Sequence, residues 1–352
     1  MRILEHVPLA PLTTLQVGGA ARYFLRCTTT LEVCEGVDWA KQRQLPLFVL
    51  GGGSNLVVAD EGFAGLVLQV AIGGIDRRAE SGKVLFDAGA GVEWDALVAQ
   101  TVQENCAGLE CLSGIPGTVG GTPVQNVGAY GQDVSQTIEE VQLLDLRDGQ
   151  LRSFCDEACG FGYRCSIFNT DERGRYIILR VSFSLEPGGE PTLTYRDLQA
   201  FFLGKERPSL TDVRHAVRNI RHSKAMLIVE GDEDSRSAGS FFKNPVLAQH
   251  EYEALSRAAG GTPPSYPAAD ERFKIPAAWL VEHAGFPKGY SRGRVGISRK
   301  HALAIVNRGG ATAAEIVDLK DEIQRGVRDK FGVMLVAEPV FVGFEQASGS
   351  RP

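Results

Sequence analysis

Hydrophobic and polar residues alternate in short blocks along much of the chain, and this pattern predicts many short β-strands. Side chains on a strand point alternately to its two faces, so a period of two marks a half-buried strand. The Asp148-Gly149 pair between two such blocks predicts a hairpin turn. The expected strands are 45–50, 56–58, 65–70, 84–87, 138–145, 151–154, 176–185 and 302–306.

A smaller number of segments carry apolar residues at helical spacing. The helix that ends near Gly108 is expected to bury its face at 97–102, and Thr312 with Glu315 forms a capping box before the last helix. The other expected helices are 31–40, 211 to about 224 and 276–285, and the last one runs over 312–332. Together these elements predict an α+β fold with a Pro- and Gly-rich boundary at 186–210.

Composition narrows the class of protein without selecting a function. The 352 residues are enough for two or three domains, and 43% hydrophobic with 23% charged residues is ordinary for a globular chain. A net charge of −6 argues against a general nucleic-acid binder, because such proteins carry a basic surface. An anionic small molecule is compatible with this charge, since a local basic cluster can bind it.

The seven cysteines fit no even disulfide framework and no zinc spacing, so we expect reduced, mostly buried thiols and no metal site. The N-terminal segment lacks the apolar core of a signal peptide. No apolar run reaches the length of about 18 residues that a membrane span needs. These features predict a cytoplasmic protein without a membrane partner.

Two glycine-rich stretches are candidates for cofactor binding. Residues 108–133 are dense in glycine and contain no Lys or Arg, and GGGSN at 51–55 lies between two expected strands. Glycine lets main chain approach closely, and successive turn N–H groups can hold an anion. The first stretch is interpreted either as a wrap around a large cofactor or as tight turns on a β scaffold. The second is either a pyrophosphate cradle or a plain hairpin.

Charged side chains form two further patterns. Arg214, Arg218 and Arg221 recur at helical spacing, which favours a solvated face over contact with an anionic ligand. The acidic segment 231–236 lacks the ligand spacing of an EF-hand.

Taken together, five motifs resemble the UDP-N-acetylenolpyruvoylglucosamine reductase (MurB) family. They occur in the family's order over nearly the whole chain, which makes coincidence a poor explanation. The motifs are VLGGGSNLVV at 49–58, SGIPGTVGGTPVQNVGAYG at 113–131, FGYRCSIF at 161–168, AGSFFKNP at 238–245, and Glu338 in the closing β segment.

The resemblance implies an FAD-binding fold of the vanillyl-alcohol-oxidase (PCMH) type over residues 1–205, in two lobes of about 1–70 and 71–205. It also implies a C-terminal α+β substrate-binding domain at 206–330. Closing strands at 331–345 are expected to return to the first lobe, followed by a tail at 346–352.

The implied activity is that of a UDP-N-acetylmuramate dehydrogenase. NADPH reduces non-covalently bound FAD, and the enolpyruvyl ether of UDP-N-acetylglucosamine then accepts a hydride and a proton, giving UDP-N-acetylmuramate. The step belongs to peptidoglycan synthesis, and therefore to cell wall biogenesis, cell shape and cell division. The family expectation is a cytoplasmic monomer whose partners are these small molecules.

The resemblance also implies which residues hold FAD. Backbone amides and small polar side chains would do so without a cation, in keeping with the lack of Lys and Arg in 108–133. The implied FAD contacts are Gly51, Gly52, Gly53, Ser54, Asn55, Leu56, Ser113, Pro116, Gly117, Thr118, Gly120, Gly121, Gln125, Asn126, Gly128 and Ala129.

Three residues align with the family's catalytic groups. Arg164 would grip the substrate carboxylate with its planar fork. Ser240 would donate the proton, and because a serine hydroxyl is a weak acid, Lys243 or the local backbone is expected to support its oxygen. Glu338 would be the catalytic acid, although it stands in LVAEP where the family pattern is roughly L-E-P-E.

Substrate contacts are implied at Tyr195, Lys224, Asn244 and Tyr163. Tyr195 stands in LTYRDL, which resembles the tyrosine-bearing loop that closes over the substrate in one subtype of the family. The segment 226–236, which follows Lys224, is longer than the family's usual linker.

Two alternatives to this function stay open at the level of the sequence. One is another FAD-dependent oxidase or dehydrogenase of the same fold, although residues 7–214 contain no histidine for a covalent flavin link. The other is a flavin- or UDP-sugar-binding regulatory protein without turnover, against which the joint presence of Arg164, Ser240 and Glu338 argues.

Overall fold

The computed structural model describes residues 1–204 and 206–344, and within it the chain forms two compact units. Unit 1 comprises Met1–Val7, Ala21–Gly53 and Ala64–Leu227. Unit 2 comprises Pro8–Ala20, Ser54–Phe63 and Ile228–Pro352. The break between them follows Leu227, whereas the sequence places a boundary near 205. The expected tail at 346–352 lies outside the described residues.

The first sheet of unit 1 carries one helix on its surface. Its strands, in order, are β1 (Leu4–Pro8), β2 (Ala20–Cys27), β5 (Phe63–Val70) and β3 (Leu47–Leu50), and α1 (Thr30–Gln42) connects β2 to β3. A Cβ placed on Gly36 of α1 would lie 2.5 Å from Leu25 and 3.1 Å from Leu68. Glycine therefore lets the helix lie directly against the strands.

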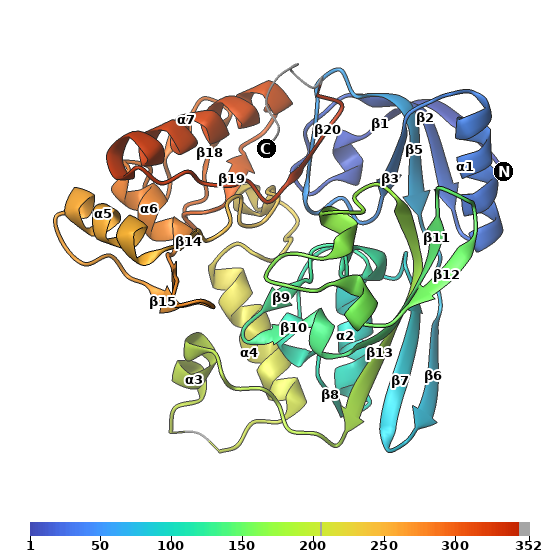
Figure 1. Ribbon diagram of the computed structural model, residues 1–352, viewed down its shortest axis with the longest axis horizontal. Helices are drawn as coiled ribbons and strands as arrows, with labels where there is room; N and C mark the ends of the chain where they lie inside the picture. The colour runs from blue at the N-terminus through green and yellow to red at the C-terminus, as the bar shows by residue number, and fades with distance from the viewer. Residues whose placement is uncertain (205, 345–352) are drawn as a thin grey trace. The chain divides into compact units, whose positions relative to one another are not determined.

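The second sheet of unit 1 is antiparallel, and its strands run side by side in Figure 1. Its order is β12 (Leu151–Phe154), β11 (Ile138–Asp145), β13 (Tyr176–Pro187), β7 (Lys83–Gly89) and β6 (Ile75–Glu80), and β8 (Cys106–Ala107) pairs with β13. The helix α2 (Trp94–Gln103) buries Trp94, whose ring centroid lies 5.6 Å from that of Phe183 in β13.

The glycine-rich stretch 108–133 lies between β8 and β11 along the chain and contains little regular structure. It includes the 3₁₀ turns η2 (Glu110–Leu112) and η3 (Val119–Gly121) and the short pair β9 (Gly128–Ala129) with β10 (Gln132–Asp133). After β13 follow α3 (Arg196–Phe202) and α4 (Leu210–Ser223). Val213 and Val217 of α4 pack with buried Cys111 of η2, so α4 supports the glycine-rich stretch.

Unit 2 combines small sheets with three helices among its described residues. The strands are β14 (Val246–Leu247), β16 (Phe273–Lys274) and β15 (Tyr266–Pro267), then β17 (Ser291–Arg292), β18 (Val295–Ile297) and β19 (Ile305–Asn307), and the parallel pair β4 (Leu56–Val58) with β20 (Val340–Val342). The helices are α5 (Gln249–Ala259), α6 (Ala277–His283) and α7 (Ala313–Phe331). Helix α7, drawn in red in Figure 1, contributes Ile316, Leu319, Ile323 and Val327 to the core of this unit.

The sequence prediction is most accurate where the local signal is strong. The predicted strands 138–145 and 151–154 match β11 and β12 at both ends. Thr312 and Glu315 form the expected capping box, and Gly332 ends α7 with φ of 70°. The prediction missed α3 and α5, and it extended the helix α2 to Gly108 although it ends at Gln103.

The α+β fold class is confirmed, and so is the state of the cysteines. All seven are free, and four of them, Cys27, Cys106, Cys111 and Cys159, are buried. Burial raises the pKa of the Cys27 and Cys159 thiols to about 12, so both stay protonated at neutral pH. None of the described helices is long and apolar enough to span a bilayer.

Candidate active site

The two glycine-rich stretches meet in unit 1 through their main chains. A Cβ placed on Gly52 would lie 2.5 Å from the Cα of Gly117, and one on Gly51 would lie 3.0 Å from Thr118 Oγ1. Side-chain carbons do not tolerate the first of these distances, so glycine is required at Gly52 for the two loops to touch. This contact joins two segments that the sequence analysis assigned separately to one cofactor.

The turn that precedes α2 holds the glycine-rich stretch in place. The N–H of Trp94 donates to the Gly117 carbonyl at 3.1 Å, and the N–H of Gly120 donates to the Ala90 carbonyl at 2.9 Å. Thr118 lies between these anchors, and its buried Oγ1 has no hydrogen-bond partner among residues 1–204 and 206–344. A buried hydroxyl without a partner is costly, so it marks a position where a ligand atom can complete the bonding.

These observations fit FAD. The loops present main chain and small side chains, the contact at Gly52 and Gly117 needs the absence of a Cβ, and Thr118 has an unmet hydrogen-bonding capacity. Ser113 is buried and its hydroxyl donates to the Glu110 carbonyl at 2.6 Å, so its side chain stabilises the loop itself.

A salt-bridge cluster ties the same stretch to α4. Asp95 accepts a hydrogen bond from the Gly114 N–H at 2.6 Å and bonds to both terminal nitrogens of Arg214, at 2.6 and 3.0 Å. Arg218 also contacts Asp95. Arg221, which is only 9% exposed, donates to the Gly114 carbonyl at 3.1 Å. The prediction of a solvated arginine face is therefore wrong for Arg214 and Arg221, because they bind Asp95 and Gly114. These two partners lie about a hundred residues earlier in the chain, so local spacing could not reveal them.

Arg164 and Asn126 link the end of the stretch to the FGYRCSIF motif. Arg164 donates to the Gly128 carbonyl at 2.6 Å and has φ of 54°, a left-handed conformation that costs a non-glycine residue about 1–2 kcal/mol. The side chain of Asn126 donates to the Gly162 carbonyl and accepts from the Ser135 N–H, each at 3.1 Å. The amide of Asn126 thus shapes the loop, and Arg164 lies against it.

The predicted substrate residues Tyr195 and Lys224 lie close together in unit 1. The ring of Tyr195 is in edge contact with Tyr130 of the glycine-rich stretch, at 5.3 Å between centroids. Lys224 caps the end of α4 and forms an ion pair with Asp197 at 2.6 Å. Burial tends to lower the pKa of the Lys224 ammonium, but the hydrogen bond to Asp197 outweighs it, so the pKa is raised and the group stays charged. Tyr163 is about half exposed, beside the guanidinium of Arg164.

Unit 2 carries Ser240 and Glu338 on neighbouring backbone segments. The N–H of Glu338 donates to the carbonyl of Phe241, the residue after Ser240, at 3.0 Å. Asn55 donates to the Glu338 carbonyl at 3.2 Å, so one predicted cofactor residue is joined to this pair of segments. The side chain of Asn244 accepts from the Ala277 N–H at 2.8 Å and thereby stabilises the start of α6.

Two polar residues next to the predicted site were missed by the sequence analysis. His301 Nε2 lies 3.2 Å from Ser240 Oγ, within hydrogen-bond distance. Glu110 is fully buried and accepts hydrogen bonds from the Gly108 N–H, Gln132 and the Thr192 N–H at 2.8–2.9 Å. His301 could have been noticed as one of only six histidines, adjoining the basic pair Arg299-Lys300.

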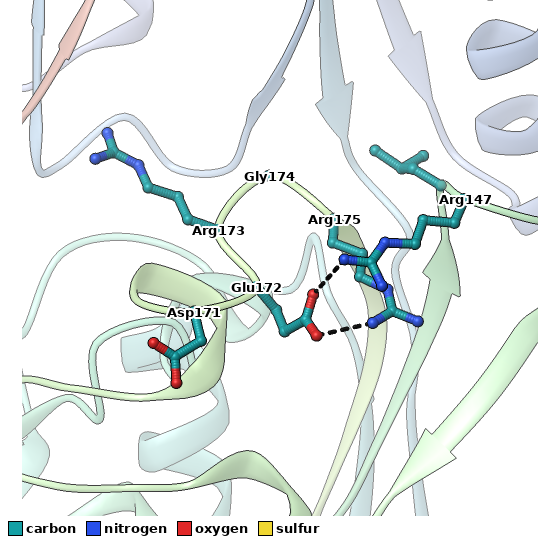
Figure 2. A pocket seen from close by; sticks show the side chains of 7 residues that line it. Arg147, Asp171, Glu172, Arg173, Gly174 and Arg175 are labelled. Carbon is teal, nitrogen blue, oxygen red and sulfur yellow. Dashed lines mark hydrogen bonds and ion pairs between the residues drawn. The ribbon is translucent and has the colours of Figure 1, made fainter.

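A separate surface hollow of unit 1, about 310 Å³ in volume, contains none of the predicted site residues. Figure 2 shows Glu172 between Arg147 and Arg175, with ion-pair distances of 3.2 and 2.9 Å. Arg175 also binds the buried carboxylate of Asp145 at 2.7 Å. Carboxylates therefore pair with both arginines, and the hollow is best explained as a structural ion-pair network.

Two protein families match different parts of the chain. The family described as "FAD binding domain" matches residues 21–154, and the family described as "UDP-N-acetylenolpyruvoylglucosamine reductase, C-terminal domain" matches residues 232–342. The first match covers both glycine-rich stretches and confirms the expected FAD-binding fold. The second covers Ser240, His301 and Glu338.

Full-length relatives support the same assignment. The UDP-N-acetylenolpyruvoylglucosamine reductases of Thermobifida fusca and Streptomyces coelicolor are 47% and 46% identical to this chain; the alignments cover 96% and 97% of it and 98% and 90% of the relatives. The crystal structure of the enzyme of this name (MurB) from Thermus caldophilus aligns with a TM-score of 0.65 and 26% identity, over 97% of this chain and 99% of that one.

Proposed function

Because the chain belongs to the UDP-N-acetylenolpyruvoylglucosamine reductase family, we propose catalytic roles for Arg164, Ser240 and Glu338 in the reaction of that family. The chain is an FAD-containing oxidoreductase that reduces UDP-N-acetylglucosamine enolpyruvate to UDP-N-acetylmuramate with NADPH, a step in peptidoglycan synthesis. The observation that carries the residue assignment is the pairing of the Ser240 and Glu338 segments in unit 2.

FAD, when bound, supplies the redox chemistry by accepting a hydride from NADPH and passing it to the enolpyruvyl methylene carbon. The residues proposed to hold it are those of the two glycine-rich stretches, in particular Gly52, Gly117 and Thr118. Gly52 and Gly117 contribute closely packed main chain, and Thr118 contributes a buried hydroxyl that can form a hydrogen bond with FAD.

Arg164 is proposed to bind the substrate carboxylate. Hydride addition leaves carbanion character on the neighbouring carbon, delocalised into that carboxylate, and a guanidinium fork can stabilise this charge with two hydrogen bonds. The bond from Arg164 to the Gly128 carbonyl fixes the direction of the fork before substrate arrives. Preorganised donors of this kind lower a barrier by about 2.7–4 kcal/mol each.

Ser240 is proposed to donate the proton to the carbanion carbon. Ser240 lies on the AGSFFKNP segment, and the buried residues Ala238 and Phe241 anchor that segment in the core. As the catalytic acid, Glu338 is proposed to act in its protonated form near the substrate carboxylate, or to orient a water molecule. The hydrogen bond from the Glu338 N–H to Phe241 supports this assignment, because it keeps the two segments together.

Tyr195, Lys224 and Asn244 are proposed to contact the UDP part of the substrate, with Tyr195 on a closing loop as in one subtype of the family. The edge contact between Tyr195 and Tyr130 and the charged state of Lys224 support a site for a diphosphate. We further propose a cytoplasmic monomer that contributes, through cell wall biogenesis, to cell shape and division.

One experiment separates this function from an oxidase and from a binding protein. The purified protein is examined for a flavin spectrum, and NADPH oxidation is followed with and without UDP-N-acetylglucosamine enolpyruvate. Steady turnover that depends strictly on this substrate is expected. Rapid NADPH oxidation with oxygen alone would favour an oxidase, and a colourless protein that binds no added FAD would refute the flavin assignment.

A further inference from the structure

Ser240 has an unusual task for a serine, because its hydroxyl is a weak acid that must release a proton. His301 lies within hydrogen-bond distance of Ser240 Oγ, with its Nε2 3.2 Å away. Histidine changes its charge between about pH 5 and 8, which makes it suited to supply and recover protons near neutrality.

The backbone of unit 2 holds this pair in place from both sides. Residues 236–241, which include Ser240, run beside the turn and strand that follow His301. The Asn307 N–H donates to the Arg236 carbonyl at 3.0 Å, and the Phe241 N–H donates to the Leu303 carbonyl at 2.8 Å. The Ala304 N–H closes the turn by donating to the His301 carbonyl at 3.2 Å. The contact of the two side chains therefore follows from paired backbone segments.

The acidic segment 231–236 holds the same turn. It contains the 3₁₀ turn η7 (Glu233–Ser235). Asp234, which is 2% exposed, accepts a hydrogen bond from the Arg299 N–H at 3.2 Å, and Asp232 pairs with Lys300 at 2.9 Å. The acidic segment thus fixes the two residues before His301 and leads along the chain directly into the Ser240 segment.

We propose that His301 is the proton source for Ser240 and that the acidic segment 231–236 positions it. The inference rests on the proposed role of Ser240 as donor. In the step, the Ser240 O–H bond breaks as the new C–H bond of the product forms. The protonated His301 gives its Nε2 proton to Ser240 Oγ in that same step, so no serine alkoxide has to form, and the neutral imidazole afterwards regains a proton from solvent.

Charged side chains lie on the segments that hold the His301 turn and on the segments paired with them. Arg299 and Lys300 are on its own turn, and Asp232, Glu233 and Asp234 are on the acidic segment. Arg236 ends the acidic segment, Lys243 is on the AGSFFKNP segment that contains Ser240, and the segment paired with AGSFFKNP carries Glu338. On α7, Glu315 and Glu322 pair with Arg294 and Arg292 of the β17–β18 hairpin.

The test is the pH dependence of the second half-reaction, measured in a stopped-flow instrument as flavin reoxidation by UDP-N-acetylglucosamine enolpyruvate. Wild-type protein should lose rate as the pH rises through the histidine range. His301→Gln can keep a hydrogen bond but cannot titrate in this pH range. It should be slower by about 10²-fold at low pH, and its pH profile should lack the histidine limb, which is the fall in rate through the histidine range. Its FAD content and its reduction by NADPH should be normal, and His301→Asn serves as a second variant.

Two controls make the result specific. His283→Gln changes an exposed histidine on α6 whose ring contacts the Trp279 carbonyl, and it should behave as wild type. Glu338→Gln removes the other titratable group proposed for this half-reaction and should keep the histidine limb. The inference is overturned if His301→Gln retains the wild-type rate and pH profile, or if Glu338→Gln removes the limb instead. Failure of Ser240→Ala to slow reoxidation would overturn the donor assignment itself.

Discussion

Asp95 and Gly114 are joined by a hydrogen bond of 2.6 Å, from the glycine N–H to a carboxylate that also binds Arg214 at two points. The side chain of Asp95 is 18% exposed, so water screens the pair only in part. One side chain of α2 thereby fixes both the helix α4 and the start of the glycine-rich loop.

Replacing Asp95 by Ala should destabilise the protein by about 3 kcal/mol, because it leaves Arg214 partly buried without its partner. It should also weaken FAD binding, since Gly114 loses its anchor. Urea denaturation and FAD titration measure the two effects. The exposed ion pair of Arg78 and Glu80 provides the control: Glu80→Ala should change stability by less than about 1 kcal/mol.

The same carboxylate predicts a pH dependence of stability. Burial raises the pKa of Asp95, but the hydrogen bonds from Arg214 and Gly114 and the charges of Arg214 and Arg218 outweigh it, so the folded pKa is lowered. A lowered folded pKa gives stability that is present above the unfolded pKa of about 3.9 and is lost as the pH falls through the folded value. Asp95→Asn should therefore unfold less steeply than wild type in an acid titration below about pH 4. Equal slopes would contradict this assignment.

Replacing Thr118 by Val should weaken FAD binding without lowering the stability of the FAD-free protein. Thr118→Val removes a buried hydroxyl that has no hydrogen-bond partner in the described part of the chain, so the FAD-free protein should be as stable as wild type or more so. FAD affinity should fall by about 0.5–1.5 kcal/mol, the usual net contribution of one hydrogen bond. Calorimetry and flavin fluorescence titration measure these quantities.

The matched control for Thr118 is Thr122→Val. The hydroxyl of Thr122 is buried and donates to the Val119 carbonyl at 2.8 Å. Its removal should lower the stability of the FAD-free protein. If Thr118→Val also lowers that stability, the hydroxyl is satisfied without FAD and the cofactor assignment of Thr118 loses its support.

Gly52→Ala tests the contact between the two glycine-rich stretches. The added methyl group would lie 2.5 Å from the Cα of Gly117, and because that atom is backbone, the loops must move apart. We expect a cost of about 1–3 kcal/mol, as for overpacking, together with loss of FAD on gel filtration. Gly73→Ala, where a Cβ meets no atom within 4 Å, should retain FAD.

Ser240→Ala separates the two half-reactions. Reduction by NADPH should stay near normal, whereas reoxidation by UDP-N-acetylglucosamine enolpyruvate should slow by about 10²–10⁴-fold, the range for a lost general acid. Single-turnover absorbance of the flavin measures both steps. Equal loss in both steps would show that Ser240 acts on FAD binding or on the fold, and not as the proton donor.

Local features of the sequence determined much of the fold and the cofactor class. The strands Ile138–Asp145 and Leu151–Phe154 and the capped start of α7 follow from periodicity and from side-chain caps that act within a few residues. The glycines at 51–53 and in 108–133 also indicate close main-chain approach from the sequence alone, because the missing Cβ is a property of each residue by itself. Family motifs then pointed to the reaction.

Only the tertiary structure decided which distant residues meet. Gly52 contacts Gly117, and the buried Arg221 donates to the Gly114 carbonyl. His301 lies within hydrogen-bond distance of Ser240, although the two residues are 61 positions apart in the chain. No local periodicity encodes these pairings, because they arise when separate backbone segments pair and bury their polar groups together. The sequence alone therefore determined many of the helices and strands and the class of cofactor. Tertiary packing decided that the arginines of α4 bind the glycine-rich stretch and Asp95, and that His301 lies beside the proposed proton donor Ser240.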